Sequence, residues 1–364
     1  MWVTVSEELV NYVKKVVYSE MTVIEEAPSY PFPIFMVIGE TKEPFKRLYK
    51  KLRPYGLVPL LRRTEDGRII LRILSYPQPP LQRKKSIRVN IILFIATLVT
   101  VSLFAFIYIS GLVEYGLIPS PSPFDLLVNV ALYTIAIFSI IGLHEIGHKI
   151  AAYLHGIDSS PPYFIPFFPF GTMGAFIIQR SPPVNRDALF DIGISGPLVS
   201  FVCTIPVAMA GIHLSYIVSS TTVEQIPTIV IPMPMLIHIL SWIANMSIPD
   251  YATVILHPLG IAAWLGALVT ALNLFPIWQL DGGHVFIAVF GRKNHKVATA
   301  VALMILFLLG YWLMFFLLLL LLMFSGGEHP GALDEVSPLS TSRKIIFLIA
   351  IVILILCIAP PASA

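Results

Sequence analysis

Two histidines and a glutamate lie within one helical turn of each other in an otherwise apolar stretch. The run IIGLHEIGHKIAAYL, residues 140–154, carries His144, Glu145 and His148 among Ile, Leu and Ala. Residues four apart share one face of a helix, so both imidazoles can bind one tetrahedral zinc ion. The glutamate between them can reach a zinc-bound water and act as the general base in hydrolysis. The alternative to a zinc site is that the two histidines only cap the end of a membrane-spanning helix or extend to the membrane surface.

A catalytic zinc site of this type needs a third protein ligand and an open position for water. The segment NLFPIWQLDGGH, residues 273–284, offers candidates. Pro276 should end the preceding helix, so that Asp281 can turn back towards the histidines. His284 is the rival ligand, and an aspartate in an ordinary Asp-Gly turn is the simpler interpretation of Asp281. Asn273 can donate a hydrogen bond to a developing oxyanion, or to the carbonyls that Pro276 frees.

The composition indicates that these residues lie in a membrane protein. The chain has 364 residues, of which 56% are hydrophobic and 12% charged, whereas soluble proteins average about 45–50% and about 25%. The net charge of +3 is small and the basic residues lie beside apolar stretches, which argues against nucleic-acid binding. Cys203 and Cys357 lie inside apolar stretches without metal-ligand spacing, so we expect neither a disulfide framework nor a thiolate site.

Six apolar segments are candidates for membrane spans, because about 20 such residues cross a hydrocarbon core of about 30 Å. His144 lies about 27 Å along the second predicted span from Leu126, at about 1.5 Å per residue, in the cytoplasmic third of the bilayer. Ionisable groups at that depth usually mark function. The six segments are residues 89–112, 126–154, 188–214, 258–276, 297–324 and 345–359.

The distribution of Lys and Arg predicts the orientation of these spans. Basic residues collect at 83–88, 180–186 and 291–296, and none occurs in the connections 113–125 and 215–257. Cytoplasmic loops carry the excess of Lys and Arg, so the first group and the candidate site should face the cytoplasm of a multi-pass cell-membrane protein. Arg343 and Lys344, between the fifth and sixth predicted spans, are the exception to this pattern.

A small polar module precedes the spans. Residues 1–82 read as a cytoplasmic, soluble α+β domain, followed by a six-helix membrane domain, 83–364, that carries the candidate zinc site. Ser6 is a plausible cap for the first helix of the module. Its predicted elements are helices in 6–17 and 42–53, strands in 32–40, 57–64 and 68–75, and a proline-rich linker in 75–82.

Between the second and third predicted spans, the stretch PPYFIPFFPFGTMGAFIIQR is apolar but too rich in Pro and Gly for a helix. Its alternation predicts a short β-hairpin or a strand with an exposed edge. An extended substrate can add to such an edge, and a purely structural re-entrant loop is the alternative. The predicted substrate-binding residues are Gly171, Thr172, Met173, Gly174, Ala175 and Phe176. The small residues of 191–197 should allow close helix packing.

Together these segments resemble the site-2 protease family of intramembrane zinc metalloproteases. The matching pieces are HEIGH, GTMGAF, GISGP and NLFPIWQLDGG, in the family's order and spacing over about residues 86–290. The resemblance implies that His144, His148 and Asp281 bind one Zn²⁺ per chain, that Glu145 is the catalytic acid/base, and that Asn273 is a catalytic hydrogen-bond donor. It also implies cleavage of transmembrane helices in membrane-anchored, often regulatory, proteins.

No PDZ-like insertion is visible, so the layout resembles archaeal members of that family and related plastid proteins. We therefore predict a mainly α, polytopic membrane protein with six transmembrane helices, a short membrane-associated β-hairpin and a small N-terminal α+β soluble domain. Its expected partners are a membrane-spanning protein substrate and the lipid bilayer, with no nucleic acid. A non-catalytic scaffold and a divalent-metal transporter are the alternatives, although the sequence shows no internal repeat of the kind that transporters carry.

Overall fold

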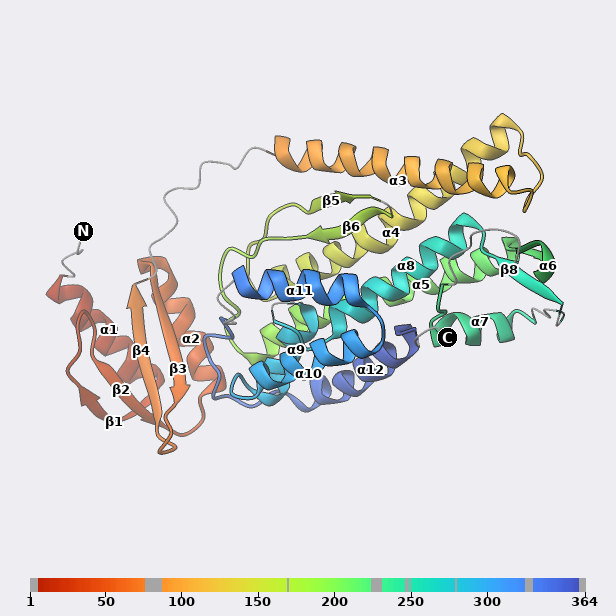
Figure 1. Ribbon diagram of the computed structural model, residues 1–364. Helices are drawn as coiled ribbons and strands as arrows, with labels where there is room; N and C mark the ends of the chain where they lie inside the picture. Colours follow the sequence, from red (N-terminus) through yellow and green to blue (C-terminus); the bar gives the residue numbers. More distant parts are fainter. Residues whose placement is uncertain are drawn as a thin grey trace.

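The computed structural model describes residues 6–75, 87–168, 170–223, 231–245, 249, 251–278, 280–324 and 330–359. Figure 1 shows a small α+β domain at one end of the molecule and long helices that run away from it. A two-stranded sheet, β7 (Tyr216–Ser219) and β8 (Ala252–Ile255), lies at the opposite end. Most of the predicted linker, residues 76–82, lies outside the described residues.

The N-terminal domain packs two helices against an antiparallel sheet of order β1-β2-β4-β3. Ser6 caps the first helix by accepting a hydrogen bond from the Leu9 N–H (3.3 Å). The apolar faces of both helices supply buried side chains to the core, among them Val13 and Phe45. The elements are α1 (Glu7–Glu20), β1 (Thr22–Ala27), β2 (Ile34–Ile38), α2 (Lys42–Leu52), a 3₁₀ turn (Arg53–Tyr55), β3 (Leu57–Arg63) and β4 (Ile69–Ser75).

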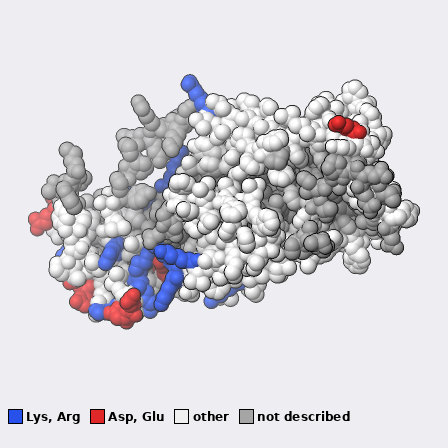
Figure 2. Space-filling model, in the orientation of Figure 1, with Lys and Arg blue, Asp and Glu red and all other residues white. Residues whose placement is uncertain are grey.

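Three helices in the described part of the chain are long and apolar enough to cross a membrane: α3 (Arg88–Glu114), α4 (Pro123–Leu154) and α5 (Arg186–Leu214). They correspond to the first three predicted spans. Helices α8 (Pro258–Leu274) and α12 (Thr341–Cys357) have 17 residues each. In Figure 2 the charged side chains gather over the N-terminal domain and its junction with the helices, and the rest of the visible face is nearly uncharged. The chain is therefore a membrane protein built mainly of helices.

The fifth predicted span, residues 297–324, is not one continuous helix, and this part of the prediction is wrong. The structure forms α10 (His295–Leu308) and α11 (Trp312–Phe324), joined by a turn. Gly310 has a φ of +81°, and the Tyr311 N–H bonds back to the Leu306 carbonyl (3.0 Å). This is the usual way in which glycine ends a helix, and uniform hydropathy conceals it.

The hairpin of α10 and α11 changes the path of the chain that follows. Helix α11 runs back towards the N-terminal domain (Figure 1), and residues 330–340 contact that domain. Arg343, at the start of α12, bonds Asp187 and Asp191 at the start of α5. Arg343 and Lys344 thus lie at the same end of the bundle as Arg186 and Arg292, so they no longer break the charge pattern.

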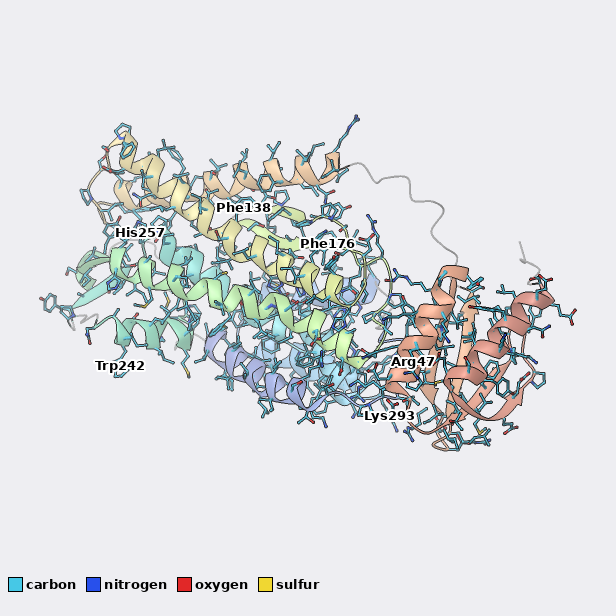
Figure 3. All side chains as sticks on the ribbon, turned by 180° about the vertical axis from the view of Figure 1, so that it is seen from behind. Arg47, Phe138, Phe176, Trp242, His257 and Lys293 are labelled. Atoms are coloured by element: carbon cyan, nitrogen blue, oxygen red, sulfur yellow. The ribbon has the colours of Figure 1, made fainter. Side chains whose placement is uncertain are left out.

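A β-hairpin packs beside the long helices. Strands β5 (Tyr163–Phe167) and β6 (Gly171–Phe176) are antiparallel and lie between α3 and the rest of the bundle (Figure 1). The far end holds the short helices α6 (Ser220–Val223) and α7 (Met235–Ile243). Figure 3 places Trp242 and His257 at that far end, and Arg47 and Lys293 at the junction with the N-terminal domain.

Candidate metal centre

Helix α4 brings its histidine pair and glutamate to one buried place in the bundle. His144 and Glu145 are 4% exposed and His148 is 6% exposed. The two imidazole Nε2 atoms lie 3.0 Å apart, as the four-residue spacing on a helix predicts. Among the described residues, these three side chains form a cluster whose ligand atoms lie close enough together, within 4.8 Å, to hold a metal ion.

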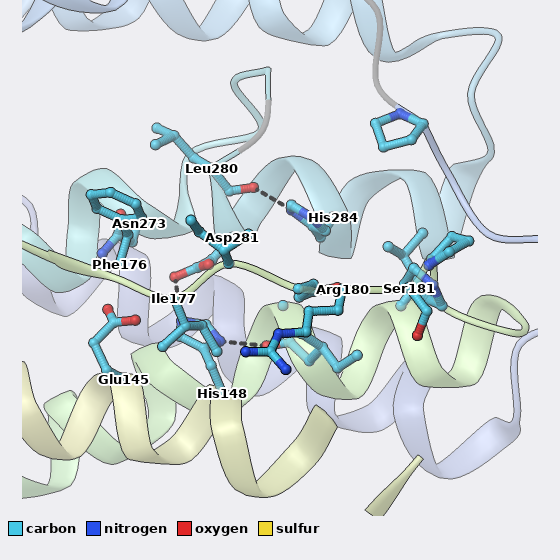
Figure 4. Close-up of a pocket in the computed structure, with 18 of the residues that line it drawn as sticks. Glu145, His148, Phe176, Ile177, Arg180, Ser181, Asn273, Leu280, Asp281 and His284 are labelled. Atoms are coloured by element: carbon cyan, nitrogen blue, oxygen red, sulfur yellow. Dashed lines mark hydrogen bonds and ion pairs between the residues drawn. The ribbon is translucent and has the colours of Figure 1, made fainter. Parts of the chain in front are cut away.

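The polypeptide turns sharply after α8 to bring Asp281 to the histidines. Helix α8 stops at Leu274, two residues before Pro276, and α9 (Asp281–Phe290) begins with the aspartate. A side chain on Gly282 would overlap the Leu274 and Phe275 carbonyls, so glycine lets α9 start directly against the end of α8. Asp281 Oδ2 lies 3.1 Å from Nε2 of His144 and 3.2 Å from Nε2 of His148. Figure 4 shows it facing His148.

The hydrogen bonds of the imidazoles define their tautomers. His148 Nδ1 lies 2.6 Å from the Ile192 carbonyl, which only accepts, so Nδ1 carries the proton. His144 Nδ1 lies 3.2 Å from Ser200 Oγ. The Ser200 hydroxyl gives its own proton to the Pro197 carbonyl (3.1 Å), so its oxygen accepts from Nδ1. In neutral imidazoles both Nε2 lone pairs then point at each other and at the Asp281 carboxylate. That convergence is repulsive unless a cation lies between the three atoms.

The donor set and its spacing fit zinc. Ligand atoms bound at about 2.0 Å to a tetrahedral zinc stand about 3.3 Å apart. The separations between the two Nε2 atoms and the Asp281 Oδ2 atom are 3.0, 3.1 and 3.2 Å. The spacing of His144, His148 and Asp281 thus suits three ligands of one zinc ion.

Helix α5 supplies features of this centre that the sequence analysis did not identify as functional. The Ile192 carbonyl and the Ser200 hydroxyl orient the two imidazoles. Gly196 lies directly against them, because a Cβ at this position would be 2.7 Å from His144 Nε2 and closer still to His148. The motif GISGP was predicted to serve close helix packing, and the structure extends that role to the edge of the metal centre.

The other candidates line the same cavity, which has a volume of about 710 Å³. Glu145 Oε1 is 4.0 Å from His144 Nε2. Asn273 Nδ2 approaches that nitrogen at 3.5 Å from the last turn of α8. His284 also lines the cavity, and its Nδ1 donates to the Leu280 carbonyl (3.0 Å). Asp281, three residues earlier, has its Oδ2 atom within 3.2 Å of Nε2 of both His144 and His148.

The cavity runs along the strand that follows the hairpin tip. Of the predicted substrate-binding residues, Ala175 and Phe176 line it, whereas Gly171, Thr172, Met173 and Gly174 do not. Gly171 instead packs on α3, where Thr100 Oγ1 donates to its carbonyl (2.6 Å). The lining continues through residues 177–183, beyond the segment predicted from sequence.

Comparison with known proteins finds similarity to zinc metalloproteases. A family model described as Peptidase family M50 matches residues 132–317. Two chloroplast proteins named probable zinc metalloprotease EGY1 are similar: the rice protein is 28% identical over 60% of this chain and 38% of its own length, and the Arabidopsis thaliana protein 29% over 62% and 42%. The chain thus spans about two fifths of the length of these relatives. A site-2 protease from Methanocaldococcus jannaschii aligns over 71% of this chain and 86% of its own, at 20% identity and a TM-score of 0.27.

Proposed function

Because the chain belongs to peptidase family M50, whose model covers half of it, we propose that it is a zinc-dependent intramembrane endopeptidase. The observation that carries the proposal is the convergence of three lone-pair donors 3.0–3.2 Å apart, with a buried glutamate beside them. This cluster lies in apolar helices, so the substrate that reaches it is a membrane-spanning or membrane-anchored protein. The N-terminal domain and the site then face the cytoplasm, as the charge pattern indicates.

Each residue of the site has its own role in the proposed hydrolysis. His144, His148 and Asp281 would hold the metal. When bound, zinc supplies a water of pKa about 7 and polarises the peptide carbonyl. Glu145, next to this position, accepts the proton of the attacking water and passes it to the leaving amine. Asn273 projects its amide into the same cavity, from where it donates a hydrogen bond to the oxyanion that develops on the carbonyl.

The outer edge of the strand that follows β6 supports the way in which substrate would bind. The Ser160 N–H donates to the Ile178 carbonyl and the Arg180 N–H donates to the Asp158 carbonyl, both at 2.9 Å. Ser159 and Gln179 face each other between these two bonds. In an antiparallel pair of this kind the backbone groups of Gln179 point away from the partner strand. An extended substrate can therefore pair with residues 177–181, in place of or in addition to β6, along the cavity wall.

The test is cleavage of a single-span membrane protein by the purified, zinc-loaded chain in detergent. Glu145→Gln should retain zinc and lose activity by a factor of about 10²–10⁴, the usual contribution of a general base. Asp281→Ala should lose zinc as well. Gln179→Ala is the matched control, because its backbone amide, not its side chain, is assigned to substrate.

Continued cleavage by Glu145→Gln would refute the mechanism. Full zinc occupancy in Asp281→Ala would refute the ligand set. Zinc flux into liposomes that hold the protein would favour transport, and intact zinc binding without cleavage of any membrane substrate would favour a scaffold.

A further inference from the structure

An extended segment between α11 and α12 joins the N-terminal domain to the wall of the metal centre. We call residues 331–337 the strap. On one side the Leu61 N–H of β3 donates to the Leu333 carbonyl (3.0 Å). On the other side the Leu333 and Asp334 N–H groups donate to the Pro183 and Val184 carbonyls, at 2.9 and 3.0 Å. The strap is thus a parallel neighbour both of the N-terminal sheet and of the chain that enters α5.

The N-terminal domain holds the strap with a polar clamp. The Arg62 guanidinium donates to the carbonyls of Leu61 (2.8 Å), Ala332 (2.9 Å) and Leu333 (2.7 Å). Its Nε lies 3.4 Å from the Glu335 carboxylate. Burial lowers the pKa of this guanidinium from its usual value, and the Glu335 charge opposes that effect. The three carbonyls and the Glu335 carboxylate therefore replace water around the Arg62 guanidinium, and most of these groups belong to the strap.

Further contacts extend the clamp along the strap. Thr41 Oγ1 and Ser337 Oγ are 2.8 Å apart and both residues are buried. Lys42 reaches past the end of the strap to Ser340 Oγ and to Asp187 of α5, both at 2.8 Å. The Leu333 side chain lies in the same hydrophobic core as Leu61. A detached strap would lose these bonds and expose this apolar side chain to water.

The strap lies where the substrate edge ends. Residues 177–181 line the cavity, with Gln179 directed away from its partner strand. From Pro183 onwards the chain is already paired with the strap. Pro330 and Gly331 line the same cavity as Ser181. A substrate strand added to this edge meets the strap after Ser181 and must leave the edge there.

We propose that the strap, clamped by the N-terminal domain, is the end wall of the substrate groove and selects which peptide bond reaches the metal centre. This inference rests on the proposed function. Ile177 lies beside Glu145 and His148 in the cavity (Figure 4). From Ile177 to Ser181 is about four residues, or roughly 13 Å of strand at about 3.3 Å each. The preferred substrate therefore has residues that can turn, such as Gly or Pro, about four positions from the cleaved bond.

The test compares Arg62→Ala with Arg63→Ala in the full chain. Arg63 is the next residue of β3, is exposed, and donates to the Gly67 carbonyl (3.3 Å) away from the strap. Each zinc-loaded variant is incubated with a single-span substrate, and the product ends are mapped by mass spectrometry. Cleavage of the enzyme after Glu335 by a glutamate-specific protease reports a detached strap.

Arg62→Ala should raise cleavage after Glu335 by a factor of roughly ten or more, because bonds from a charged donor are each worth at least that factor. Its substrate cuts should spread to neighbouring bonds, whereas Arg63→Ala should keep the wild-type position. Arg62→Lys keeps the positive charge but loses the planar guanidinium with its several donors, so its substrate cuts should spread less than those of Arg62→Ala. This variant replaces Arg62→Ala in the experiment if Arg62→Ala does not accumulate as folded protein.

A strap that opens in Arg62→Ala while the cut position stays unchanged would overturn the end-wall role. A strap that stays protected in both Arg62 variants would overturn the clamp. A wild-type protein that binds zinc and cuts no substrate would instead refute the proposed function.

Discussion

Replacement of Gly196 by alanine tests the geometry of the metal centre with a single methyl group. The new Cβ would lie 2.7 Å from His144 Nε2 and 2.6 Å from His148 Cε1, against 3.4 Å or more in an ordinary contact. The His144 ring must therefore move away by about 0.7 Å, and the His148 ring, whose Nε2 would lie 2.2 Å from the new Cβ, by about 1.2 Å. Metal sites tolerate deviations of about 0.2 Å in ligand distance. We expect zinc affinity to fall by about 100-fold or more, close to 3 kcal/mol.

Gly142→Ala is the matched control. Gly142 lies in α4 two residues before His144, and a Cβ there meets only the Phe164 ring, at 3.9 Å. Both substitutions raise helix propensity by roughly 0.5–1 kcal/mol, so a difference between them reports the collision at the imidazoles. Zinc affinity is measured by competition with a chromophoric chelator, and folding by thermal melting in detergent. Equal zinc affinity in the two variants, with both folded, would refute this account of the centre.

Two further predictions concern the same centre. Ser200→Ala should weaken zinc binding by about 10–100-fold, because His144 Nδ1 loses its acceptor; Ser139→Ala, a half-buried serine of α4, should bind zinc as the wild type does, and an equal loss in both would contradict the assignment. Removal of zinc by a chelator should abolish cleavage and lower the melting temperature, because a ligand at about 1,000 times its Kd contributes about 4 kcal/mol. Melting that does not respond to chelator and added zinc would contradict a metal held by the folded state alone.

The local parts of the metal centre were open to prediction from the sequence. Residues four apart share one face of any helix, so the proximity of His144 and His148 could be predicted. Pro276 likewise predicts the end of α8, after which the chain brings Asp281 to the histidines. Ser200 and Gly196 gave no such signal, because their importance depends on how α5 crosses α4. A serine or a glycine in an apolar helix is otherwise an ordinary packing residue.

The longer-range features were harder to predict for the same reason. Gly310 is a local signal for the break between α10 and α11, but a hydropathy average over about 20 residues does not register a single glycine. The strap pairs residues more than 140 positions apart in sequence, since Pro183 and Leu61 both meet Leu333. No periodicity in a single sequence encodes such a pairing. The substrate edge was predicted in residues 171–176, of which Ala175 and Phe176 line the cavity, and the lining continues through residues 177–183.

The hairpin of α10 and α11 has a consequence for the membrane itself. Its longer arm, α10, has 14 residues, or about 21 Å of helix, against a hydrocarbon thickness of about 30 Å. The pair packs through Leu303 and Leu306 on Leu272 and Phe275, at the end of α8 close to the metal centre. Lipids beside so short an apolar element compress to match it, so we expect the bilayer to be locally thin here. Water would then have a shorter path to Glu145, the proposed general base, and a substrate helix would lose part of its surrounding lipid at the place where the proposed reaction requires it to unwind.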